Sequence, residues 1–123
     1  MSDTDPRPPV AFGHVGPHLV PDIDEGTTFY ESLGLRTVAR PDGMAIMEVR
    51  GGTHLILREG TPNTDRAPFD LMVDDIDAAH ASYAEAGHDV SDIGRGHIHD
   101  NFTLVDPAGA TVTVNSSHAM GSV

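Results

Sequence analysis

An internal repeat constrains the fold of this chain more than any other feature of its sequence. Val20-Pro-Asp-Ile-Asp24, followed by Phe29-Tyr30 and Gly34, returns as Val73-Asp-Asp-Ile-Asp77, followed by Ser82-Tyr83 and Gly87. The two copies are 53 positions apart at Asp22 and Asp75, at Tyr30 and Tyr83, and at Gly34 and Gly87. A register that holds without a gap across a strand, a turn and a helix indicates a duplicated module. Two such modules, related by a pseudo-twofold axis, would enclose a cleft where a small molecule can bind.

The pattern of apolar residues and turn residues predicts one β-α-β-β-β module in each copy, and hence an α+β fold. Pro17 restricts the first strand to an edge or a bulged position. Asp22 and Asp75 are expected to cap the two helices, and Gly34 and Gly87 to end them. In module one we expect strands at 13–20, 36–39, 44–49 and 54–58, with a helix at 22–32. In module two we expect strands at 69–73, near Val90, and at 101–105 and 111–115, with a helix at 75–85.

These elements form a single domain from residue 12 to residue 118, with module one at about 12–60 and module two at about 67–118. The first eleven residues contain three prolines and several charges and are expected to form a loose tail. The polar segment 59–67 connects the modules. A last-strand turn recurs at an offset of 57 rather than 53, so module two has about four additional residues, which we assign to the loop 91–99.

Composition excludes several classes of protein. The 123 residues include no Cys, which excludes a disulfide framework and thiolate metal sites, and no apolar run is long enough to span a bilayer, so we expect a cytoplasmic protein. The formal charge of −12 disfavours nucleic acid and anionic membranes as partners. It is compatible with a cleft that attracts a cationic ligand, and equally with solubility and helix capping, because many of the carboxylates stand where helix caps are expected.

The motifs resemble those of the vicinal oxygen chelate superfamily, which includes glyoxalases, extradiol dioxygenases, fosfomycin-resistance enzymes and bleomycin-resistance proteins. The resemblance covers nearly everything from Phe12 to Asn115. It is carried by Val20-Pro-Asp22, Phe29-Tyr30 with Leu33-Gly34, Val73-Asp-Asp75, and 102–109. It implies two βαβββ modules, each with its sheet curled around a cup, usually in a homodimer.

The metal-using members of this superfamily place a His, Glu or Gln on the first and last strand of each module. Here the last-strand positions fall on Ile56 and Thr113, and the first-strand position of module two falls on Pro68. The remaining position falls on Val15, or on His14 if a bulge near Pro17 shifts the register. Isoleucine and proline cannot ligate a metal, and threonine is a poor ligand for a divalent cation. We therefore expect no metal and no other cofactor.

The resemblance then favours metal-independent binding of a small molecule, as in bleomycin-resistance proteins, which sequester a drug and take a cationic ligand between two subunits. The absence of Trp favours a small polar ligand over a large planar antibiotic. The alternative is a glyoxalase-like lyase, isomerase or hydrolase that uses cup histidines as acid or base or as a relocated metal site. A third is a sensory or accessory domain that binds a partner protein.

Eight histidines are available to furnish such a site. They could serve as neutral hydrogen-bonding groups and π surfaces, as an acid or base held by Asp70 or Asp100, or as ligands of a relocated metal. We expect His54, His99 and one of His14 or His18 to converge on one cavity, and His80, His88 and His118 to be surface or capping residues. The candidate ligand-binding residues are His14, His18, His54, Asp70, His99, Asn101 and Thr113.

Overall fold

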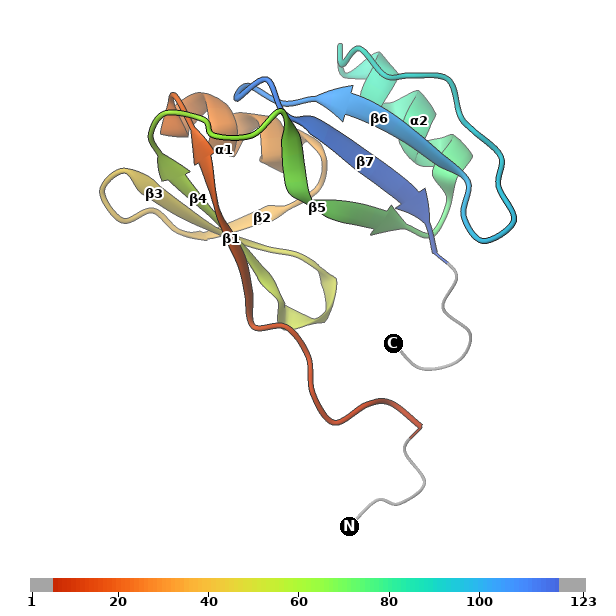
Figure 1. Ribbon diagram of the computed structural model, residues 1–123, viewed down its shortest axis with the longest axis horizontal. Helices are drawn as coiled ribbons and strands as arrows, with labels where there is room; N and C mark the ends of the chain where they lie inside the picture. Colours follow the sequence, from red (N-terminus) through yellow and green to blue (C-terminus); the bar gives the residue numbers. More distant parts are fainter. Residues whose placement is uncertain (1–5, 118–123) are drawn as a thin grey trace.

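Module one has the predicted order of elements and forms one sheet backed by one helix (Figure 1). The protein is represented by a computed structural model that describes residues 6–117, so the surface or capping role expected for His118 lies outside the described residues. The sheet has the order β1-β4-β3-β2, with β1 parallel to β4 and the other pairs antiparallel. The elements are β1 (His14–Val20), α1 (Ile23–Ser32), β2 (Arg36–Ala39), β3 (Met44–Glu48), the 3₁₀ turn η1 (Arg50–Gly52) and β4 (His54–Glu59).

Module two repeats this plan with its second strand reduced to a single bridge. Its elements are β5 (Arg66–Val73), α2 (Ile76–Glu85), β6 (Asn101–Val105) and β7 (Thr111–Ser116), in a sheet of order β5-β7-β6. The segment that follows α2 lies along β6, where Ser91 N donates to Thr103 O at 2.9 Å and Gly94 forms an isolated bridge with Asn101. The strand expected near Val90 is therefore present only as this contact.

Both helices begin and end as their sequences predict. Asp22 Oδ1 accepts hydrogen bonds from the N–H groups of Asp24 and Glu25, and Asp75 Oδ1 accepts one from Ala78. These carboxylates satisfy N–H groups that have no partner within the helix, and their charge suits the positive end of the helix dipole. Gly34 and Gly87 follow the two helices with φ values of 112° and 97°, which only glycine adopts readily.

Each sheet has one buried face and one open face. Leu55 and Leu57 of β4 and Met47 of β3 are buried on the side covered by α1, and Val112 and Val114 of β7 are buried on the side covered by α2. Alternate residues point away from the helices. We call this second side the open face of each sheet.

The first strand contains a bulge near Pro17, which sets the directions of its side chains. His14 pairs with His54 and Val15 with Leu55, but the register then shifts, so that His18 pairs with Leu57. Gly16 lies inside the bulge with φ 110°, and a Cβ there would meet Ile56 O at 2.7 Å. His14 and His18 point to opposite faces of the sheet, because the bulge reverses the alternation between them. His18 points to the buried face.

The two modules meet where β1 lies beside β5 (Figure 1). The ring of Phe69 on β5 packs against the rings of His18 and Tyr30, with centroids 5.5 Å and 6.0 Å apart. Across the same boundary, Tyr83 OH donates to Leu33 O at 2.8 Å. One hydrophobic core therefore extends through both modules, as expected for a chain of this length.

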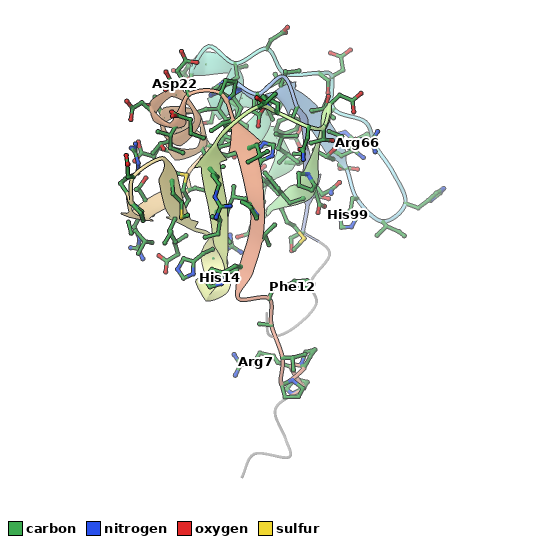
Figure 2. The ribbon with its side chains drawn as sticks, turned by 60° about the vertical axis from the view of Figure 1, so that its left-hand side comes forward. Arg7, Phe12, His14, Asp22, Arg66 and His99 are labelled. Carbon is green, nitrogen blue, oxygen red and sulfur yellow. The ribbon has the colours of Figure 1, made fainter. Side chains whose placement is uncertain are left out.

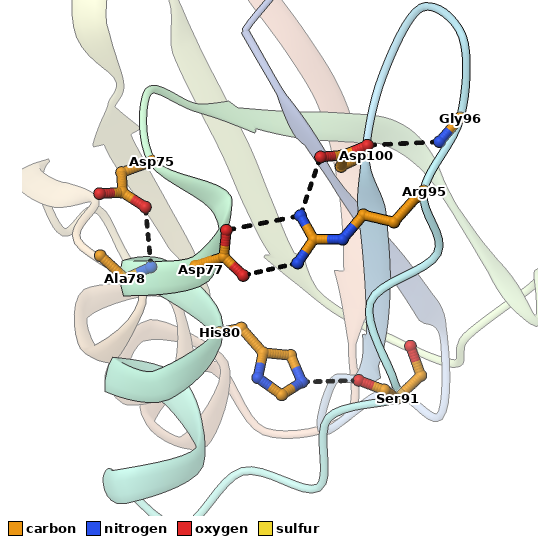
Figure 3. A network of polar contacts seen from close by, with 8 residues as sticks. All are labelled: Asp75, Asp77, Ala78, His80, Ser91, Arg95, Gly96 and Asp100. Carbon is orange, nitrogen blue, oxygen red and sulfur yellow. Dashed lines mark hydrogen bonds and ion pairs between the residues drawn. The ribbon is translucent and has the colours of Figure 1, made fainter.

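The loop between α2 and β6 is fastened by one arginine (Figure 3). Arg95 donates to Asp77 on α2 at 2.7 Å and to Asp100 at 2.9 Å, and the backbone N–H of Gly96 also donates to Asp100. The hydrogen bond from Arg95 holds the pKa of Asp77 below its ordinary value.

No helix within residues 6–117 has the length and apolar character needed to cross a membrane.

Candidate functional site

The open face of module one carries a polar row that crosses all four strands. Arg36, Glu48, His54 and His14 occupy successive paired positions on β2, β3, β4 and β1. Arg36 forms an ion pair with Glu48, and the rings of His14 and His54 stack with centroids 5.6 Å apart. The row therefore presents two imidazoles side by side, each with nitrogen atoms that can donate or accept a hydrogen bond.

The open face of module two is lined by amide, hydroxyl and carboxylate groups. Asp70 on β5 pairs with Thr113 on β7, and Asn101 on β6 pairs with Asn115. The side-chain amide of Asn115 donates to the carboxylate of Asp70. This donor is a neutral amide, so the contact places no positive charge beside the carboxylate. Three of the predicted ligand-binding residues, Asp70, Asn101 and Thr113, thus lie on one sheet face.

His99 lies apart from the other histidines of the predicted set. It precedes β6 in module two, whereas His14 lies in module one (Figure 2). Its Nδ1 approaches Ser116 O at 2.6 Å, and because a carbonyl oxygen only accepts, Nδ1 carries the proton. The expected convergence of His54, His99 and His14 or His18 on one cavity is therefore wrong. Of these histidines, His14 and His54 are the pair that the fold brings together.

The strand registers show which way the side chains point at the positions that the resemblance assigns to metal ligands. Ile56 and Thr113 lie on the open faces, since their neighbours along each strand are buried. His14 also faces the open side, and Val15 packs against the core, so the bulge places His14 rather than Val15 at the remaining position. Within residues 6–117, no group of three or more His, Asp or Glu side chains is arranged to hold a metal ion.

His18 is buried inside the protein and is hydrogen-bonded to the carboxylate of Asp106. Its Nε2 lies 2.6 Å from Oδ2 of Asp106, and Tyr30 OH donates to the same oxygen at 2.7 Å. The other oxygen, Oδ1, accepts the N–H groups of Ala108 and Ala110. Since an ionised carboxylate only accepts, His18 donates through Nε2. His18 is 2% exposed, so it cannot reach a ligand on the open face, and its assignment as a ligand-binding residue is wrong.

Burial and hydrogen bonding act in opposite directions on the carboxyl group of this cluster. Burial alone would raise the pKa of Asp106, but the hydrogen bonds from His18, Tyr30 and the Ala110 N–H outweigh it and hold that pKa below its ordinary value. Burial, reinforced by the charge of Asp106, raises the pKa of Tyr30. The cluster ties the turn after β6 in module two to β1 and α1 in module one. The sequence predicts Asp106 only as a turn residue, and no motif in it indicates that Asp106 contacts His18 and Tyr30.

The carboxylates proposed to hold a catalytic histidine have other partners. Asp70 accepts from Asn115, and Asp100 accepts from Arg95 and Gly96.

A cavity of about 830 Å³ lies between the modules. Of the predicted ligand-binding residues, Asp70 is the one that lines it. Its rim includes the exposed residues Phe12, Arg50 and Asp74, and Arg50 donates to Asp74 through two hydrogen bonds of 3.0 Å. Its walls are mainly apolar and comprise Val15, Leu33, Leu35, Val49, Leu55, Phe69, Leu71, Val73 and Tyr83.

The fold and the open sheet faces define a two-module α+β protein of the vicinal oxygen chelate type. The model of the glyoxalase-like domain family matches residues 15–115, and the chain belongs to this family. No curated protein matches the sequence.

Solved structures of the same superfamily share the fold at low sequence identity. Lactoylglutathione lyase from Agrobacterium tumefaciens is 20% identical with a TM-score of 0.73, and the match covers 94% of this chain and all of that one. TnmS3, an antibiotic-binding protein from Streptomyces sp. CB03234, is 23% identical with a TM-score of 0.74, covering 87% and 95%. A bleomycin resistance determinant encoded on the transposon Tn5 is 20% identical with a TM-score of 0.67, covering 89% and 98%. At these identities the likeness establishes the fold.

Proposed function

We propose that the protein binds a small polar molecule on the open faces of its sheets, without a metal ion. The observation that carries this proposal is the composition of those faces. Where metal-using relatives hold ligating side chains, this chain has Ile56, Pro68 and Thr113, with His14 as the one remaining imidazole. Around them stand hydrogen-bonding groups that need no cation, namely the stacked imidazoles in module one and the Asn, Thr and Asp side chains in module two.

The charge of the protein supports a ligand that carries a positive charge. The chain has a formal charge of −12, and Asp70 adds a carboxylate on the open face of module two. Such a field raises the local concentration of cations and their rate of association. The antibiotic-binding protein and the bleomycin resistance determinant that share this fold make a cationic antibiotic a reasonable ligand class. We also propose a homodimer, in which the open faces of two chains would enclose the ligand.

We propose His99 as a peripheral ligand contact from the edge of module two.

A thermal-shift screen of cationic antibiotics and small oxo-acids, carried out in EDTA, tests this function. We expect at least one cationic compound to raise the melting temperature, because a ligand that binds the folded state stabilises it. A stabilisation that appears only after a divalent metal is added would contradict the proposal.

His54→Ala then tests the location of the site. The substitution should weaken binding of the stabilising compound about tenfold, because it removes one imidazole of the stacked pair. It should change the free energy of unfolding by less than about 1 kcal/mol, as expected away from the packed core. The matched control is His97→Ala, at an exposed position in the loop before β6, which should leave binding unchanged. Equal losses in both variants, or a large destabilisation with unchanged binding, would contradict the assignment.

A further inference from the structure

The cavity between the modules follows from a difference between the two copies of the repeat. The turns at the ends of β3 and β6 are equivalent, since Val49 N donates to Thr53 O at 3.0 Å and Asp106 N donates to Ala110 O at 2.9 Å. Val49 therefore takes the place of Asp106. On the first strand of each module, His18 pairs with Leu57 and Leu71 pairs with Val114, so Leu71 takes the place of His18.

This correspondence means that the two sides of the module boundary are filled differently. On one side, His18, Tyr30 and Asp106 close the space with hydrogen bonds. On the other side, the equivalent residues are Leu71, Tyr83 and Val49, and all three line the cavity. Neither Leu71 nor Val49 can form such bonds, and Tyr83 donates to a backbone carbonyl instead. The space that a polar cluster fills on one side is left open and apolar on the other.

The lining of the cavity determines the kind of molecule that would fit. Its volume lies within the usual range for small-molecule pockets, which are mostly apolar with a few polar groups. The polar groups at this boundary already have partners within the protein. Arg50 and Asp74 pair with each other, Asp70 accepts from Asn115, and Tyr83 OH is bonded to Leu33 O. A ligand would therefore gain mainly from apolar contact, and burying a charged group among these walls would cost the hydration of that group.

We propose that this inter-module cavity is a second binding site, separate from the open faces, for a neutral and largely apolar small molecule. The site takes one wall from each module, with Val15 and Leu55 on one side and Leu71, Val73 and Tyr83 on the other. Its occupant would contact both modules at once. The proposal does not depend on ligand binding at the open faces, because Asp70 is the one predicted ligand-binding residue that also lines the cavity, and the other walls of the cavity are mainly apolar.

The experiment titrates the full chain with the neutral naphthalene dye Prodan and follows its fluorescence. The variant Leu71→Trp places an indole in the cavity, and Val105→Trp places one at an exposed position on β6 as the matched control. We expect the native chain and Val105→Trp to bind the dye equally, and Leu71→Trp to bind it at least tenfold more weakly. The native chain has no Trp, so the emission of each variant reports one site. Leu71→Trp should emit at shorter wavelength than Val105→Trp, as expected for an indole shielded from water.

Three results would overturn the proposal. The first is the absence of saturable dye binding to the native chain. The second is equal dye binding by both Trp variants. The third is loss of dye binding in His54→Ala, which would place the dye on the open face. If Leu71→Trp does not fold, amide chemical shifts of the native chain decide the question. Dye should then shift the resonances of Val15, Leu35 and Tyr83, and shifts confined to His54 and Thr113 would refute the site.

Discussion

A single buried carboxylate, that of Asp106, joins the two modules at the scale of individual residues. It accepts four hydrogen bonds, from His18, Tyr30 and two backbone N–H groups of its own turn. A buried charge is costly unless its hydrogen-bonding capacity is filled, and here both oxygens have donors. The contact therefore fixes the position of module two against β1 and α1 of module one.

Asp106→Asn is expected to destabilise the protein by about 1–3 kcal/mol at neutral pH, since the substitution removes a charged acceptor from buried donors. The effect should depend on pH. The pKa of Asp106 is lowered in the folded state, so its contribution is fully present above the unfolded-state pKa of about 3.9 and is lost as pH falls through the folded value. The difference in unfolding free energy between the native chain and the variant should therefore shrink as pH falls from about 5, as measured by urea denaturation.

The control for this prediction is Asp92→Asn, an exposed carboxylate in the loop after α2. It should change stability by no more than about 0.5 kcal/mol at any pH. If Asp106→Asn were as stable as the control at neutral pH, the buried cluster would not hold the modules together.

At the scale of elements, each helix depends on an aspartate at its N-cap. Asp22 accepts two N–H groups at 2.9 Å and 3.0 Å, and Asp75 accepts one at 2.9 Å. Asp22→Ala should lower the free energy of unfolding by about 1 kcal/mol because it leaves those N–H groups without a protein partner. Asp22→Asn keeps the capping oxygen and should lose much less. Chemical denaturation monitored by circular dichroism measures both, and equal losses would exclude capping as the cause.

The elements were largely predictable because their signals are local. Asp22 with Gly34, and Asp75 with Gly87, mark both helices, and the turn at 106–109 separates β6 from β7. The bulge in β1 was predictable only as a possibility, because Pro17 indicates an irregular strand without fixing where the register shifts. The reduction of the second strand of module two was not predictable, since the long loop before β6 contacts that strand only through the Ser91–Thr103 hydrogen bond and the Gly94–Asn101 bridge among the described residues.

At the scale of the whole molecule, the repeat predicts two similar modules but not how they meet. Asp70, Asn101 and Thr113 lie on one face, because strand alternation and the register of one sheet determine their directions. The buried position of His18 could not be predicted, because its partner Asp106 is 88 residues away in the sequence and no local pattern relates the two residues. The cavity was also not predictable, since it arises from the replacement of His18 and Asp106 by Leu71 and Val49 in the other copy.

We propose that this member of the glyoxalase-like family binds its ligand without a metal, because Ile56, Pro68 and Thr113 stand at positions where a metal would need ligating side chains. The most direct test is elemental analysis of the full chain purified without added metal or chelator. We predict well under one transition-metal ion per chain, with no change in melting temperature when EDTA is added. One bound Zn, Ni, Fe or Mn per chain, with a melting temperature that falls in EDTA, would contradict the account.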